Sequence, residues 1–111
     1  MKTVYVIVIA IVLNAWAAAA DFMRAKFVLA NSAELGLPSS CVLPLGLLKA
    51  AGALGLLLGL LGVPLIGLAA AVGLVLFFLG ALFVHVRAKV FHNIAVPAGF
   101  FAIAVAAVLV Q

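Results

Sequence analysis

Long runs of apolar residues dominate the chain, and a few polar positions separate them. A helix that spans a membrane needs about 17–25 largely apolar residues, and four runs meet that length, at 3–21, 43–61, 63–86 and 94–110. None of them alternates apolar and polar positions as the strands of a membrane barrel do. Because an open strand leaves its backbone unsatisfied in lipid, the pattern predicts an all-α fold.

The breaks between the runs predict how the helices connect. Gly62 and Pro64 leave room only for a tight turn, so the second and third helices are expected to form an antiparallel hairpin. Pro44 and Pro64 stand where helices begin, and a missing N–H costs little there. The connection 22–42 is expected to be an interfacial helix, or a prolonged first helix, followed by a loop.

Composition narrows the class of protein. Of 111 residues, 71% are hydrophobic and 7% are charged, whereas a soluble domain is about 25% charged. So few charges cannot cover a water-soluble globule, which excludes a soluble enzyme and, despite the net charge of +4, a nucleic-acid-binding module. We therefore predict one integral membrane domain over residues 1–111, an up-and-down antiparallel bundle of four transmembrane helices in the cell membrane.

The N-terminal run has a second interpretation. Lys2, an apolar stretch and the alanines at 17–20 are also typical of a cleavable secretory signal. We expect the segment to be retained as a transmembrane helix.

The basic residues predict an orientation. The connections 21–42 and 87–93 fall on one side of a four-span bundle and carry two basic residues each, whereas Lys2 lies on the other side. By the positive-inside rule, both termini are expected outside the cytoplasm.

A few polar residues interrupt the apolar runs and suggest a site. A charge inside a membrane helix costs about 2.5–3.5 kcal/mol, so such residues generally face the bundle and have a partner. Alternating helix directions bring the polar positions of the first three helices toward the same membrane face. We predict a ligand-binding cavity in one leaflet lined by Asn14, Asp21, Lys49 and His85, with Arg24 and Arg87 at its mouth.

Other interpretations of these residues stay open. One is that Asp21 and Lys49 form a purely structural ion pair. A second is that Lys49 extends to the lipid headgroups, and a third is that the cluster handles protons or ions. Small residues four apart, such as Gly55 and Gly59, indicate close helix packing within the hairpin or between two copies of the chain. No metal site is expected, and the single cysteine, Cys41, excludes an intrachain disulfide.

The second and third runs resemble the DoxX-like family of small four-helix bacterial membrane proteins. The resemblance rests on the GALGLLLGL pattern from Gly52 and on the end of the third helix, with Gly80, Ala81, His85 and Arg87 in the pattern GAxxxHxRA. It implies a multi-pass protein of the bacterial inner membrane. It also implies, by analogy with the membrane thiosulfate:quinone oxidoreductase subunit that gives the family its name, a role linked to quinones.

Three functions follow as hypotheses. The first is an accessory or structural subunit of a membrane complex, whose partners are the bilayer, other membrane proteins or a second copy of the chain, and whose pocket takes a quinone or lipid headgroup as its only cofactor. The second is a small four-helix transporter, although Asn14 stands mid-span in the first helix where small exporters use a glutamate. The third is a membrane-embedded enzyme with Asp21 and His85 as acid and base. No catalytic residue is assigned, and catalysis by this chain alone is the less favoured hypothesis.

Overall fold

The computed structural model describes residues 2–111, and within that range the regular structure is entirely helical. The elements are α1 (Lys2–Phe22), α2 (Lys26–Glu34), a 3₁₀ turn η1 (Ser39–Cys41), α3 (Val42–Leu60), α4 (Pro64–Arg87) and α5 (Ala95–Leu109). No strand occurs between residues 2 and 111. The predicted all-α fold is confirmed.

Three of the helices are long and apolar enough to cross a membrane. They lie at Thr3–Phe22, Ser39–Leu60, which includes η1, and Pro64–Arg87. The fourth predicted span is helical over Ala95–Leu109, but its 15 residues place it among the shorter apolar helices. At 1.5 Å per residue α5 is about 22 Å long, less than the roughly 30 Å of a hydrocarbon core.

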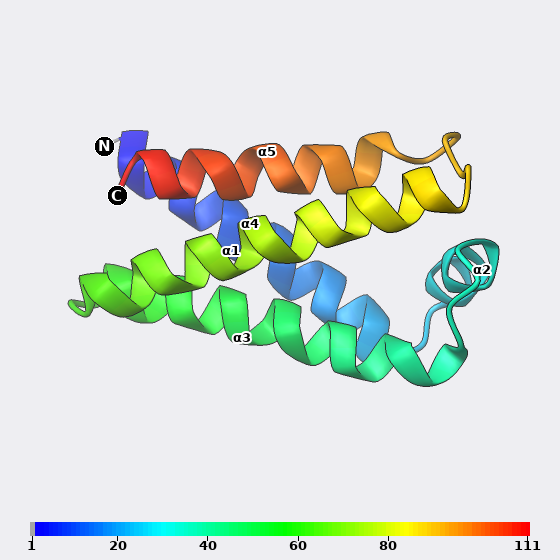
Figure 1. Cartoon of the computed structure of the whole chain (residues 1–111). Coiled ribbons are helices and arrows are strands. Elements are labelled where there is room, and N and C mark those ends of the chain that lie inside the picture. The colour runs from blue at the N-terminus through cyan, green and yellow to red at the C-terminus, as the bar shows by residue number, and fades with distance from the viewer. Residues whose placement is uncertain (1) are drawn as a thin grey trace.

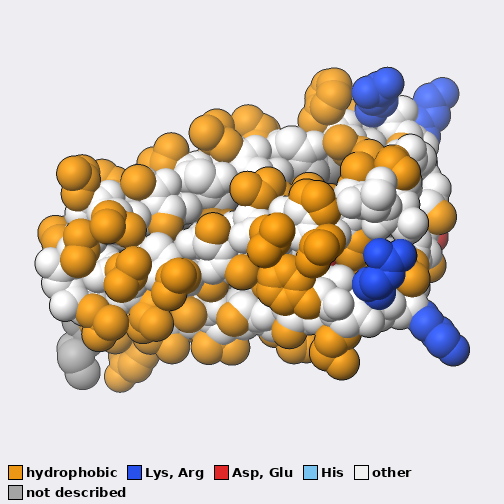
Figure 2. All heavy atoms as spheres, turned by 90° about the horizontal axis from the view of Figure 1, so that it is seen from below, with side chains coloured by type: hydrophobic (Ala, Val, Ile, Leu, Met, Phe, Trp, Pro, Cys, Tyr) orange, Lys and Arg blue, Asp and Glu red, His pale blue; other side chains and the backbone are white. Residues whose placement is uncertain are grey.

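The four longest helices lie side by side (Figure 1). α1 packs against α3 and α5, and α4 packs against the same two helices. Both ends of the chain lie at one end of the molecule, and α2 lies at the other (Figure 1). The flank between the two ends exposes mainly hydrophobic side chains, whereas the lysines and arginines that are coloured in this view gather at one end (Figure 2). An apolar belt with a charged rim is the surface expected of a protein that lies in a bilayer.

The core is small and is built largely from alanines where helices meet. All four long helices contribute to it, with Ile7, Ala10, Leu56, Ala71, Leu74, Phe78, Ala104 and Ala107. The rings of Phe78 and Phe100 stack at 5.1 Å between centroids and join α4 to α5. Small side chains let helix backbones approach closely, and this packing drives helix association in lipid.

Glycines bring α3 and α4 into the closest contact. A Cβ added at Gly59 would stand 2.6 Å from the Cα of Gly67, and one added at Gly55 would stand 2.6 Å from the Cβ of Ala70. Residues 61–63 connect the two helices. The Gly55/Gly59 pattern is therefore used within the chain, the first of the two interpretations the sequence allowed.

Four helices end in the same hydrogen-bond pattern, in which one residue takes a left-handed conformation. That residue is Arg24 after α1, Gly36 after α2, Gly62 after α3 and Lys89 after α4. In each case the N–H of the following residue donates to a carbonyl five residues earlier, as from Ala25 to Ala20 at 3.1 Å. For a residue with a Cβ this conformation costs about 1–2 kcal/mol, more than the roughly 0.3–1 kcal/mol that a cation gains at a helix C-terminus.

The segment 22–42 forms a helix separate from α1. α1 ends at Phe22, and α2 begins at Lys26 after the left-handed Arg24. α2 folds back so that the ring of Phe27 stacks on Trp16 of α1, with 5.9 Å between centroids. Of the two predicted forms, a distinct short helix is present, and a prolonged first helix is not.

The α3–α4 contact gives a matched prediction. Gly59→Ala should destabilise the protein by about 1–3 kcal/mol, because its Cβ meets the backbone of α4. Gly73→Ala makes the same change within a helix at a position where a Cβ meets nothing within 4 Å. It should be neutral, or stabilising by up to about 1 kcal/mol through helix propensity. Unfolding of both variants in detergent micelles, followed by circular dichroism, measures the difference, and equal effects would contradict the close approach.

Candidate functional site

An ion pair joins α1 to α3 inside the apolar body of the protein. The Nζ of Lys49 lies 3.0 Å from Oδ2 of Asp21. The Asp21 side chain is 6% exposed and that of Lys49 is 18% exposed. The two charges compensate one another where each alone would be costly. The structural ion pair that the sequence allowed is therefore present, with one partner partly accessible from outside.

Small and aromatic neighbours shape the surroundings of this pair. Gly46 makes room for Asp21, because a Cβ at Gly46 would stand 2.8 Å from the Asp21 Cβ. Lys49 lies nearly one turn further along the same face of α3, so its side chain reaches back toward the carboxylate. Its Nζ also lies 5.6 Å from the ring centroid of Phe77 on α4, which is a cation–π contact. The pair thus connects three helices.

Asn14 is buried deeper in α1 and bonds within its own helix. Its Nδ2 donates to the carbonyl oxygen of Ala10 at 2.9 Å. Its Oδ1 is buried and meets no hydrogen-bond donor among the described residues. Asn14 lies seven residues from Asp21, about 10 Å along the helix. The Oδ1 of Asn14 is therefore a buried hydrogen-bond acceptor without a donor among the described residues, and it lies deeper in the bundle than Asp21.

His85 is buried in the last turn of α4 and also bonds within its helix. Its Nδ1 donates to the carbonyl oxygen of Ala81 at 2.8 Å, which leaves Nε2 as the ring's acceptor in the neutral form. Nε2 is buried, and no described residue donates to it. His85 lies eight residues beyond Phe77, about 12 Å further toward the charged end.

The structure brings only two of the six predicted site residues into direct contact. Asp21 and Lys49 are bonded to one another, whereas Asn14 and His85 each bond a carbonyl oxygen of their own helix. Arg24 and Arg87 are exposed at the charged end.

A second polar cluster at the same end was not singled out from the sequence. Nδ2 of Asn93 donates to Oδ1 of Asn31 at 2.7 Å, and Nε2 of His92 pairs with Oε2 of Glu34. Both contacts fasten α2 to the α4–α5 connection. The sequence signal for them is weak, since Asn31 and Glu34 share one face of α2 but their partners lie about sixty residues away.

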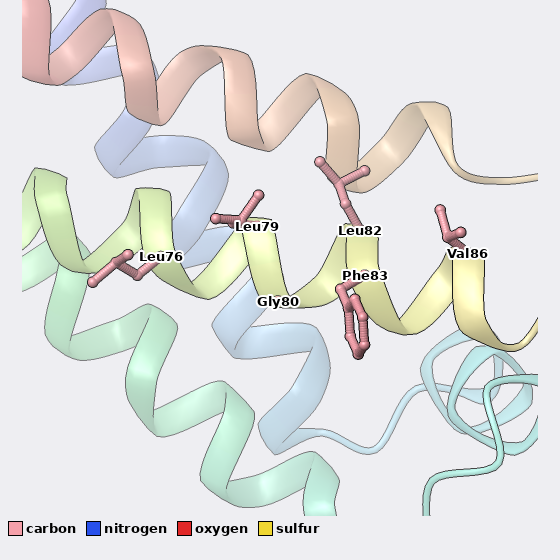
Figure 3. A pocket seen from close by; sticks show the side chains of 6 residues that line it. All are labelled: Leu76, Leu79, Gly80, Leu82, Phe83 and Val86. Atoms are coloured by element: carbon pink, nitrogen blue, oxygen red, sulfur yellow. The ribbon is translucent and has the colours of Figure 1, made fainter.

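Two apolar hollows lie on the surface formed by α3 and α4. One lies over α4 alone, around Gly80 (Figure 3), and is lined by Leu76, Leu79, Gly80, Leu82, Phe83 and Val86. The other lies between α3 and α4 and is lined by Leu48, Ala51, Gly52, Ala70, Gly73, Leu74, Leu76 and Phe77. Neither is lined by a predicted site residue. The second hollow, however, includes Phe77, which contacts the Lys49 ammonium.

The candidate metal ligands and the cysteine of the chain lie apart in the structure. Between residues 2 and 111, no three His, Cys, Asp or Glu side chains gather closely enough to hold a metal ion. Cys41 is free and half-buried at the start of α3.

The apolar flank, the three long apolar helices and the charged end define a small helical membrane protein. The sequence matches the DoxX-like family over residues 5–107, nearly the whole chain, and the protein belongs to that family. The family suggested by the glycine pattern and the end of α4 is thereby confirmed. No curated protein and no solved structure matches the chain.

The ion pair gives a second prediction. Asp21→Asn should destabilise the protein by about 3 kcal/mol, because it leaves the Lys49 ammonium without its counter-charge in an apolar setting. The double variant Asp21→Asn/Lys49→Met should be less destabilised than Asp21→Asn alone, because no unpaired charge remains. Glu34→Gln breaks an exposed pair and should cost at most about 1 kcal/mol. A double-mutant cycle on unfolding in micelles measures the coupling, and additive single effects would refute it.

Proposed function

We propose that this protein is an accessory subunit of a membrane complex and that it binds a quinone or a lipid headgroup beside the Asp21–Lys49 pair. The observation that carries the proposal is the ion pair itself. It places the ammonium of Lys49, whose side chain is 18% exposed, within an otherwise apolar body. An ionisable group inside a membrane protein is costly in lipid. Where a partner group holds it inside the helices, it is by default a candidate binding site.

The hollow between α3 and α4 supports a ligand with a polar head and an apolar tail. Its walls are apolar, and it extends to Phe77, whose ring lies under the Lys49 ammonium. A quinone ring or a headgroup would accept a hydrogen bond from Lys49 while its chain occupies the hollow. Pockets of this kind combine apolar walls with a few polar groups that orient the ligand. Asn14 and His85 would contribute only to a ligand that extends along the bundle axis.

We further propose that α5 crosses the bilayer, so that four antiparallel spans form the bundle. α5 packs against both α1 and α4. The residues flanking it, Ile94 and Val110, are apolar and extend its apolar stretch. A short span is accommodated by local thinning of the bilayer or by flanking residues that reach the interface, at a modest cost. The multi-pass arrangement and the inner-membrane location rest on this proposal and on the family.

The role of accessory subunit rests on the lack of a convergent catalytic set among the described residues. An enzyme using Asp21 and His85 needs both at one substrate atom. Asp21 bonds Lys49 and His85 bonds the carbonyl oxygen of Ala81, so each side chain is engaged elsewhere and the two are not bonded to one another. For a transporter, Asn14 offers no titrating carboxylate in the middle of α1, and its amide is engaged by Ala10. No specific observation favours either alternative.

Ligand binding is tested with a short-chain ubiquinone analogue as the probe. Quenching of Trp16, the single tryptophan, reports its binding to the purified protein. Asp21→Asn/Lys49→Met should weaken binding by about tenfold or more, the loss expected for a charge-assisted hydrogen bond. Glu34→Gln, which removes a carboxylate from α2 only, should leave binding unchanged. Binding that is equal in all three proteins would reject the pocket.

The four-span topology is tested with the single cysteine. Cys41 lies at the charged end, in the connection predicted to face the cytoplasm. A membrane-impermeant maleimide should label it in inverted vesicles and not in right-side-out cells. The variant Cys41→Ser/Gln111→Cys moves the thiol to the C-terminus and should show the opposite labelling if α5 crosses the membrane. Labelling of both thiols from the same side would show that α5 does not span.

A further inference from the structure

Four exposed cations gather at one end of the bundle without acidic partners. Arg24, Lys26, Arg87 and Lys89 are all exposed, and the lysines and arginines cluster at that end in Figure 2. The two acidic residues of the chain are already engaged, since Asp21 pairs with Lys49 and Glu34 with His92. The four cations outnumber the Glu34 carboxylate, the one acidic group at this end outside the Asp21–Lys49 pair, so the end carries a net positive charge.

Two of these cations hold backbone positions that suit glycine better. Arg24 and Lys89 take positive φ values of 50° and 58°, in the residue that closes the C-terminus of α1 and of α4. At the opposite end of the molecule, α3 closes in the same way with Gly62. At the charged end, two of the three left-handed closures are therefore basic residues and the third is Gly36, whereas the closure at the opposite end is Gly62.

Helix-end electrostatics do not account for this choice. The cost of a left-handed conformation in a residue with a Cβ exceeds the gain that a cation makes with the helix dipole, as compared above. Neither Arg24 nor Lys89 has an acidic side chain as a salt-bridge partner within the described chain. An anionic partner outside the chain would add a favourable term to this balance.

The position of these residues along the helices indicates what that partner is. α1 has 21 residues and α4 has 24, so each rises about 32–36 Å, slightly more than a hydrocarbon core. Arg24 and Lys89 directly follow these helices and therefore lie at the level of lipid phosphates.

We propose that Arg24 and Lys89, with Lys26 and Arg87, form a binding surface for the headgroups of anionic phospholipids in that leaflet. Guanidinium and ammonium groups bind the phosphate diester and the net negative charge of such lipids. This surface lies outside the Asp21–Lys49 pocket and does not depend on it. The strained backbone at the two helix ends is the conformational cost of holding the cations where the phosphates lie.

The test uses a substitution whose effects on folding and on binding have opposite signs. Arg24→Gly/Lys89→Gly removes two charges and supplies the residue that the backbone prefers, so the protein should remain folded and become no less stable in neutral detergent. Binding of phosphatidylglycerol, measured by native mass spectrometry of the protein in nanodiscs of phosphatidylglycerol diluted in phosphatidylcholine, should weaken by about fivefold for each charge. Raised salt should reduce the binding of the original protein.

Two controls make the result specific. Arg24→Lys/Lys89→Arg keeps both charges and should bind phosphatidylglycerol as the original protein does. Lys2→Gln lowers the net charge in the first residues of α1 and should leave binding unchanged. Equal lipid binding by the glycine variant would overturn the proposal, as would competition by free inorganic phosphate as effective as that by the lipid. Asp21→Asn/Lys49→Met should weaken binding of the ubiquinone analogue but retain the salt-sensitive binding of phosphatidylglycerol, so failure of the pocket and failure of this surface are distinguishable.

Discussion

Satisfaction of backbone hydrogen bonds within an apolar solvent is the constraint on which the rest of this structure depends. Helices meet it along their length, but each helix leaves its last carbonyls without partners. Here α1, α2, α3 and α4 close on themselves through the same left-handed turn. Those turns must lie at the boundaries of the hydrocarbon core, so they define the two ends of the molecule. The depth of every charged residue is then set by its distance from these turns along the helix.

Close packing follows from the same constraint. Lipid gives helices little hydrophobic reason to associate, so contact area and close approach must supply the energy. The chain achieves this with Gly55 and Gly59 against α4 and with a core of alanines where all four long helices meet. Gly46 serves the same purpose at the ion pair, where the missing side chain lets α3 approach Asp21. Packing and site geometry thus share one cause.

The polar residues divide into two levels with different roles. The Asp21–Lys49 pair is buried among three helices and borders an apolar hollow, which suits a ligand that is itself mostly apolar. The cations that follow α1 and α4 face outward at the charged end, where a bilayer presents phosphates. The α2 helix, fastened by Asn31 and Glu34 to the α4–α5 connection, lies at that same end. A subunit built in this way would position both a buried ligand and the surrounding lipids for its partners.

The apolar runs by themselves determined the number and approximate limits of the long helices. α3 and α4 are each shifted by one residue from their predicted limits, because hydrocarbon length and backbone satisfaction act locally along the chain. The sequence also indicated that Asp21 and Lys49 fall in one leaflet, since alternating helices constrain depth. It did not show that Asn14 and His85 would bond carbonyls of their own helices, because rotation about the helix axis depends on the neighbouring helices.

Only the tertiary structure decided the contacts between distant segments. Glu34 meets His92 and Asn31 meets Asn93 across about sixty residues, and no periodicity encodes such a pairing. The left-handed turns at Arg24 and Lys89 were equally hidden, since local preference favours glycine in that conformation. Depth in the membrane is a property of the linear sequence, whereas registry between helices is a property of their packing.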